Sequence, residues 1–144
     1  MEQRISLVTL GVDDLARSRR FNELLGWTGQ EVQETVFLQA GGMALVLWGR
    51  TQLAQDAGLD SSTRREFDGI VLAQNVRTRQ EVDDIVSDAV KAGATVTRPP
   101  AVTFYGGYAA VFTDLDGHAW EIAHNPGFPL ADDGTLTIPD LGGG

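Results

Sequence analysis

The chain has 144 residues, of which 42% are hydrophobic and 22% are charged, an ordinary composition for one soluble globular domain. The formal net charge of −9 argues against nucleic acid and anionic membranes as partners, because both are themselves negative. There is no cysteine, which excludes disulfides and metal thiolates. With no long apolar run and no apolar leader segment at the start, we expect a cytoplasmic protein.

The first half reads as one strand, one helix and three further strands. A β-rich run over 5–12 is followed by Asp13 and Asp14, either of which can cap a helix that begins at Leu15 and ends at Gly26. Short strands are predicted over 28–31, 35–39 and 43–48. The expected apolar stripe of the helix consists of Leu15, Phe21, Leu24 and Leu25.

The second half repeats this order after a polar linker over 51–66 that has room for a short helix near 52–57. A strand over 67–76 leads to Thr78 and Glu81, which form a capping box for a helix that stops at Gly93. A strand over 94–97 is expected to break at Pro99 and Pro100, and another covers 104–113. The residues after 126 are expected to form a surface tail over 127–144.

The repeated order predicts an α+β fold built from two βαβββ modules, over 4–50 and 67–125, in a single domain over 1–126. Two such modules can pair their curved, mixed sheets into a cup with the helices outside.

The turn after residue 113 has the pattern D-x-D-G, with Asp114, Asp116 and Gly117, and leads into the last strand. Alternation along that strand places Glu121 on one face with alanines, and His118 and His124 on the other face with Trp120 and Ile122. The carboxylate of Glu121 is therefore either a functional group or an edge residue in contact with water. The two histidines are expected at the surface or against a helix.

An apolar concavity with one carboxylate suits a small hydrophobic or aromatic ligand. Glu121 can accept a hydrogen bond from that ligand, act as a catalytic acid or base, or remain as a remnant paired with the backbone or with Thr9. Trp48 and Trp120 are expected to face the helices, and the other aromatic residues can also simply fill the core. The candidate ligand-binding residues are Leu7, Thr9, Leu45, Leu47, Gly69, Val71, Phe104, Tyr105, Tyr108 and Glu121.

Three features resemble the vicinal oxygen chelate superfamily, which includes glyoxalase I, bleomycin-resistance proteins and extradiol dioxygenases. They are the segment 7–18 followed by Phe21 and the Leu-Gly-Trp at 25–27, the repeated module, and the run 114–122. That run is similar to the pattern D-P-D-G-x-x-x-E-L, with Leu115 in place of proline.

The resemblance implies a divalent metal held by His or Glu from the first strand of each module and by Glu from the last strand. Glu121 matches the last position. The first-strand positions fall on Leu7 and Gly69, and the fourth strand offers only Leu45 or Leu47, so the metal site is degenerate. One carboxylate does not hold a divalent ion against water, so we predict no metal and no cofactor.

Three functions stay open from the sequence. The first is a bleomycin-resistance-like protein that sequesters its ligand without metal. The second is a glyoxalase-type or dioxygenase-type enzyme, a lyase or an oxidoreductase, with an atypical site around Glu121. The third is an unliganded homologue that acts through dimer contacts. The resemblance also implies a homodimer.

Overall fold

The computed structural model describes residues 1, 3, 5–62 and 67–142. The chain divides into two compact units, the first comprising Met1–Ile70 with Leu115–His118 and the second Val71–Asp114 with Ala119–Gly144. The predictions that cover residue 4, linker residues 63–66 and tail residues 143–144 fall outside the described residues.

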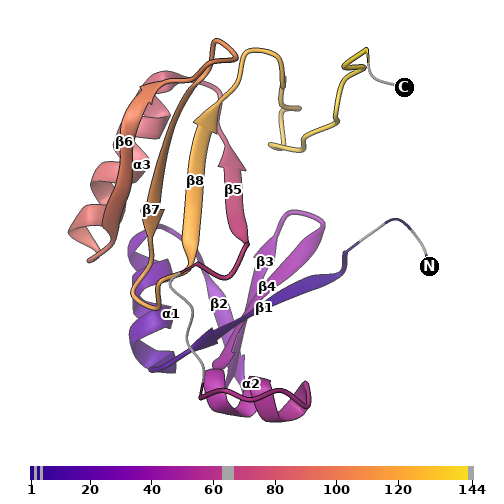
Figure 1. Ribbon diagram of the computed structural model, residues 1–144, viewed down its shortest axis with the longest axis vertical. Helices are drawn as coiled ribbons and strands as arrows, with labels where there is room; N and C mark the ends of the chain where they lie inside the picture. The colour runs from indigo at the N-terminus through magenta and orange to yellow at the C-terminus, as the bar shows by residue number, and fades with distance from the viewer. Residues whose placement is uncertain (2, 4, 63–66, 143–144) are drawn as a thin grey trace. The chain divides into compact units, whose positions relative to one another are not determined.

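The first unit contains one four-stranded mixed sheet and two helices (Figure 1). The strand order is β1-β4-β3-β2, with β1 parallel to β4 and the other pairs antiparallel. The elements are β1 (Leu7–Val12), α1 (Leu15–Leu24), β2 (Gly29–Val32), β3 (Thr35–Ala40), β4 (Met43–Gly49) and α2 (Arg50–Asp56).

The second unit repeats the order of the first, with the sheet β5-β8-β7-β6 and β5 parallel to β8. Two mixed sheets of identical strand order confirm the predicted α+β fold of two βαβββ modules. The elements are β5 (Val71–Asn75), α3 (Arg79–Lys91), β6 (Thr95–Val102), β7 (Tyr108–Thr113) and β8 (Ala119–His124).

Helix starts were predictable from short polar signals. Asp14, not Asp13, caps α1 by accepting a hydrogen bond from the backbone N–H of Arg17 at 3.0 Å. Thr78 and Glu81 form the predicted capping box at the start of α3, each side chain accepting a backbone hydrogen bond from the other residue.

Each sheet buries one face against its own helix. In the first unit Leu10, Val36, Leu38 and Leu47 have at most 7% exposure, and α1 contributes buried Phe21. The stripe predicted for α1 is partly wrong: Leu24 is 50% exposed, and Ser18 and Asn22 are buried instead. Asn22 is accommodated because its side-chain amide donates to the carbonyl oxygen of Ser18 at 2.9 Å. In the second unit the buried set is Val82, Val86, Ala89, Ala110, Phe112 and Ile122.

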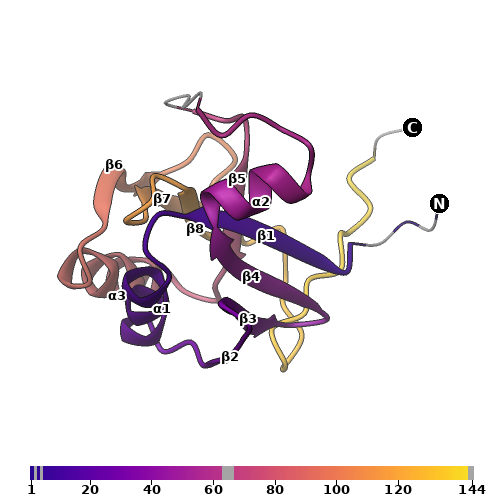
Figure 2. The same cartoon turned by 90° about the horizontal axis from the view of Figure 1, so that it is seen from below.

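Three of the predicted strands differ from the observed strands, whereas the short helix for which the linker had room is present as α2. Strand β6 continues through Pro99 and Pro100, which an edge strand tolerates because one side needs no N–H donors. The strands predicted over 67–76 and 104–113 begin only at Val71 and Tyr108. The predicted linker begins with α2, which lies beside β1 and β4 (Figure 2).

The tail belongs to the second unit. The Nη2 group of Arg77 donates to the carbonyl oxygens of Ala131 and Asp132 at 2.7 and 3.1 Å. No helix among the described residues is long and apolar enough to cross a membrane.

The hairpin between β2 and β3 turns through Gln33 and Glu34, whose φ angles are +49° and +60°. The left-handed conformation costs about 1 kcal/mol or more for a residue with a Cβ atom, and glycine avoids that cost. We expect Glu34→Gly to raise the free energy of unfolding by about 1 kcal/mol in urea denaturation. Gln30→Gly, inside the neighbouring strand, should instead lower it, since glycine weakens a strand interior. Destabilisation by Glu34→Gly would contradict the assignment of backbone strain to this turn.

Candidate functional site

Glu121 lies on the face of the second sheet opposite α3. Its backbone pairs with Ala73 on β5 and with Val111 on β7, and paired residues project to the same face. The neighbouring strand positions, Trp120 and Ile122, pair with Phe112 and Ala110 on the buried face. The alternation predicted for the last strand is therefore confirmed. We call the face that carries Glu121 the open face of the second sheet.

Arg98 on β6 is the partner of Glu121. Its Nη2 group donates to Oε2 of Glu121 at 3.0 Å, and the two side chains are 53% and 32% exposed. The sequence analysis suggested Thr9, a residue of β1 in the first unit, and did not identify Arg98. An ion pair this exposed contributes at most about 1 kcal/mol to stability. The open face therefore carries a cation and an anion that are joined by a hydrogen bond.

Of the other candidates in the second unit, Val71 lies on the open face and Tyr108 does not. Val71 pairs with Ala119, two residues before Glu121, and is 46% exposed. Gly69 precedes β5, in a bend with φ of +80°, so the first-strand position of this module falls on Val71 instead.

Tyr108 was predicted beside the ligand, but it faces α3 because it pairs with His124 on the buried side. Its hydroxyl donates to Asp83 at 2.8 Å, and the guanidinium carbon of Arg79 lies 5.6 Å from the centre of its ring. The hydrogen bond to Asp83 raises the pKa of Tyr108 above its usual value.

Phe104 and Tyr105 lie in the turn between β6 and β7. Phe104 is fully exposed and meets Tyr105 edge to face, with ring centres 5.2 Å apart. Both residues are accessible, and neither is packed into a core.

Strand pairing in the first unit shows which face of the sheet each candidate residue occupies. Leu7 and Thr9 pair with Ala44 and Val46 and lie on the face opposite α1. Trp48 pairs with Gly11 on that same face, so the prediction that Trp48 faces α1 is wrong.

The sequence analysis placed Leu45 and Leu47 beside the ligand, and that placement is wrong. They pair with Val8 and Leu10 and have 5% and 2% exposure on the buried face. A continuous apolar strand carries no alternation signal, which is why its face could not be assigned from sequence.

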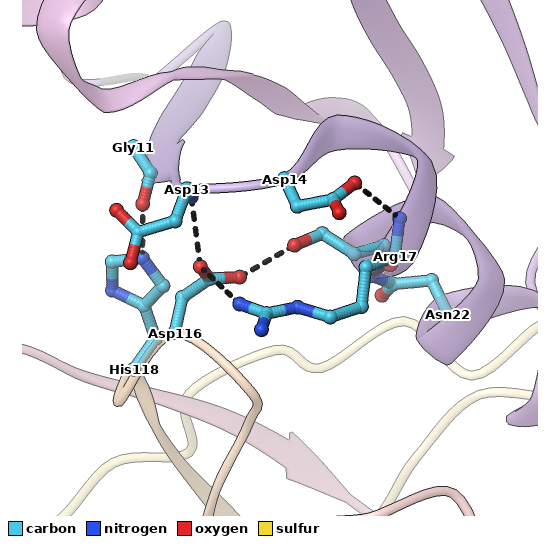
Figure 3. Close-up of polar contacts among 8 residues, drawn as sticks. Gly11, Asp13, Asp14, Arg17, Asn22, Asp116 and His118 are labelled. Atoms are coloured by element: carbon cyan, nitrogen blue, oxygen red, sulfur yellow. Dashed lines mark hydrogen bonds and ion pairs between the residues drawn. The ribbon is translucent and has the colours of Figure 1, made fainter.

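The D-x-D-G turn brings Asp116 to the start of α1, within the first unit (Figure 3). Its carboxylate accepts hydrogen bonds from the backbone N–H of Asp13 at 2.9 Å and from the hydroxyl of Ser18. Arg17 adds an ion pair at 3.4 Å, and the side chain of Asp116 is only 5% exposed. These bonds tie the turn to the start of the helix.

The histidine rings bind backbone carbonyl groups. Nε2 of His118 donates to the carbonyl oxygen of Gly11 at 2.8 Å, beside Asp116 (Figure 3), and Nδ1 of His124 donates to that of Val76 at 3.3 Å. These bonds give both rings a structural role.

The donor set does not fit the metal that the resemblance implies. Leu7 and Val71 each open the first strand of their module and offer only carbon atoms, while Glu121 is bound to Arg98. Among the described residues no three His, Cys, Asp or Glu side chains form a group that could hold a metal ion. A divalent ion needs several converging donors, and these residues do not supply them.

Metal content provides a direct check. A resident ion at one hundred times its dissociation constant would add about 2.7 kcal/mol to the stability, and EDTA would remove that contribution. We expect the purified protein to hold far less than one equivalent of divalent metal by mass spectrometry and to melt at the same temperature after EDTA dialysis. Stoichiometric metal together with a lowered melting temperature would show that the donor set does hold an ion.

Replacement of Asp116 tests the turn contact. Asp116→Ala leaves the N–H of Asp13 and the hydroxyl of Ser18 without their acceptor, so we expect a loss of roughly 2–4 kcal/mol in the free energy of unfolding. The exposed Asp68 provides a matched control, and Asp68→Ala should change stability by less than about 0.5 kcal/mol. Equal effects of both substitutions in urea denaturation would contradict a structural role for Asp116.

Comparison with known proteins agrees with this architecture. The family model of the Glyoxalase/Bleomycin resistance protein/Dioxygenase superfamily matches residues 4–122. A solved glyoxalase-related enzyme from Fulvimarina pelagi is 35% identical with a TM-score of 0.85, covering 94% of this chain and 98% of that one. A hypothetical protein from S. aureus is 30% identical with a TM-score of 0.76, over 86% and 94% of the two chains. No curated protein sequence matches. The chain belongs to the glyoxalase/bleomycin resistance protein/dioxygenase superfamily.

Proposed function

We propose that this protein binds a small hydrophobic or aromatic molecule on the open face of the second sheet, without a metal, as a bleomycin-resistance-like member of its family. The observation that carries the proposal is the Arg98–Glu121 pair. About half of the Arg98 side chain and one third of the Glu121 side chain are exposed, and the pair lies on the sheet face opposite α3. A few fixed polar groups on an apolar surface are typical of sites for small organic ligands.

The residues around the pair are small or apolar. Ala73 is exposed beside Glu121 on one side, and Val111 lies on the other, partly buried. Such side chains offer apolar surface to an aromatic ring, which gains about 25 cal/mol for each Å² of apolar surface that it removes from water. The Arg98–Glu121 pair then provides the polar contact that fixes the ligand's orientation.

A lyase or dioxygenase activity around Glu121 receives no specific support from this geometry. Such chemistry needs a metal or a second acid or base that acts on the substrate, and the paired neighbours of Glu121 are Ala73 and Val111. Binding is therefore the function that the arrangement favours.

A thermal-shift screen of aromatic compounds tests the proposal. A compound at one hundred times its dissociation constant adds about 2.7 kcal/mol, which corresponds to a rise of roughly 5 °C or more in the melting temperature. We expect at least one compound to produce this rise, and Ala73→Phe to abolish it by filling the face, without lowering the melting temperature of the free protein.

Two further variants sharpen the screen. Ala16→Phe adds the same bulk at an exposed position of α1 and should leave the ligand effect intact. Glu121→Ala should reduce the effect by half or more, because the polar contact is lost. A ligand effect that is unchanged in both Ala73→Phe and Glu121→Ala would refute binding at this face.

A further inference from the structure

Strand β6 carries more residues than the strand it pairs with. It has eight residues against six in β7, and the surplus enters as two shifts of register. Val96 pairs with Phe112, Arg98 pairs with Val111, and Ala101 pairs with Ala109. Each shift inserts one extra residue into β6, so Arg98 lies between two β-bulges.

The bulges decide which face Arg98 occupies. In an unbroken strand Arg98 would share the face of Val96, which pairs with Phe112 on the buried side under α3. The first shift instead pairs Arg98 with Val111, beside Glu121 on the open face. The second shift, at Pro99 and Pro100, restores the original alternation. Bulges of this kind are frequent next to functional sites, where they redirect a single side chain.

We propose that Arg98 is the specificity-determining residue of this face and binds the carboxylate of an aromatic or hydrophobic organic acid. This inference rests on the proposed function, which it deepens by naming the ligand class. A guanidinium has five N–H donors in a planar fork, and Nη2 binds Glu121. Glu121 accepts from one nitrogen of the fork, and the side chain of Arg98 remains 53% exposed.

The net charge of −9 opposes an anionic ligand at long range, so the assignment depends on the short-range contacts that Arg98 can make. An exposed ion pair contributes little to folding, so stability alone does not account for two bulges that redirect one arginine. Hydrogen bonds from a guanidinium to a carboxylate are about twice as strong as neutral ones and fix the ligand's orientation.

The experiment compares two probes of the same shape, 1-naphthoate and its neutral amide, 1-naphthamide, by fluorescence titration in low-salt buffer. We expect the native protein to bind 1-naphthoate about tenfold or more tightly than 1-naphthamide. Arg98→Gln should remove that preference, with a much larger loss of affinity for 1-naphthoate than for 1-naphthamide. Arg98→Lys, which keeps the charge but not the fork, should retain only part of the preference.

The matched control is Arg20→Gln, which makes the same change of charge at an exposed position of α1 and should keep the full preference. Equal affinity of the native protein for both probes, or an equal loss of both in Arg98→Gln, would overturn the role of Arg98 and leave the proposed binding function standing. Failure of both probes to bind would count against the proposed function itself, and the inference would fall with it.

Discussion

The pairing of residues between neighbouring strands decides what every other side chain in this protein can do. Paired residues share a face, and each sheet has one face buried under its helix. Glu121 reaches Arg98 and the solvent only because Ala73 and Val111, its partners, lie away from α3. A shift of one residue in β8 would exchange Glu121 with Trp120 or Ile122 and bury a carboxylate in the core.

Much of the architecture follows from local signals in the sequence. The capping box at Thr78 and the alternation around Glu121 each depend on residues close together in the chain, so both could be predicted. The repeated order of elements predicted two modules of one topology, and both sheets have the same strand order. Family membership follows from the same motifs, since the matching family model covers residues 4–122.

The remaining features depend on contacts between distant residues. Leu45 and Leu47 belong to a strand that is apolar throughout, so only its pairing with β1 reveals which side faces the helix. Arg98 reaches Glu121 through a bulge that simple alternation does not contain, although the proline pair after it is a sequence signal for an irregular edge. Asp116 binds residues about one hundred positions earlier in the chain, a distance at which turn chemistry predicts nothing.

The prolines of β6 also affect how this protein behaves at high concentration. An outer strand with unpaired N–H and C=O groups can recruit a strand from another molecule, and such recruitment begins many ordered aggregates. Pro99 and Pro100 remove two successive donors from this outer strand, and the bulges on either side of Arg98 disturb its regular spacing. The irregularity that directs Arg98 toward Glu121 therefore also protects the margin of the sheet against intermolecular growth.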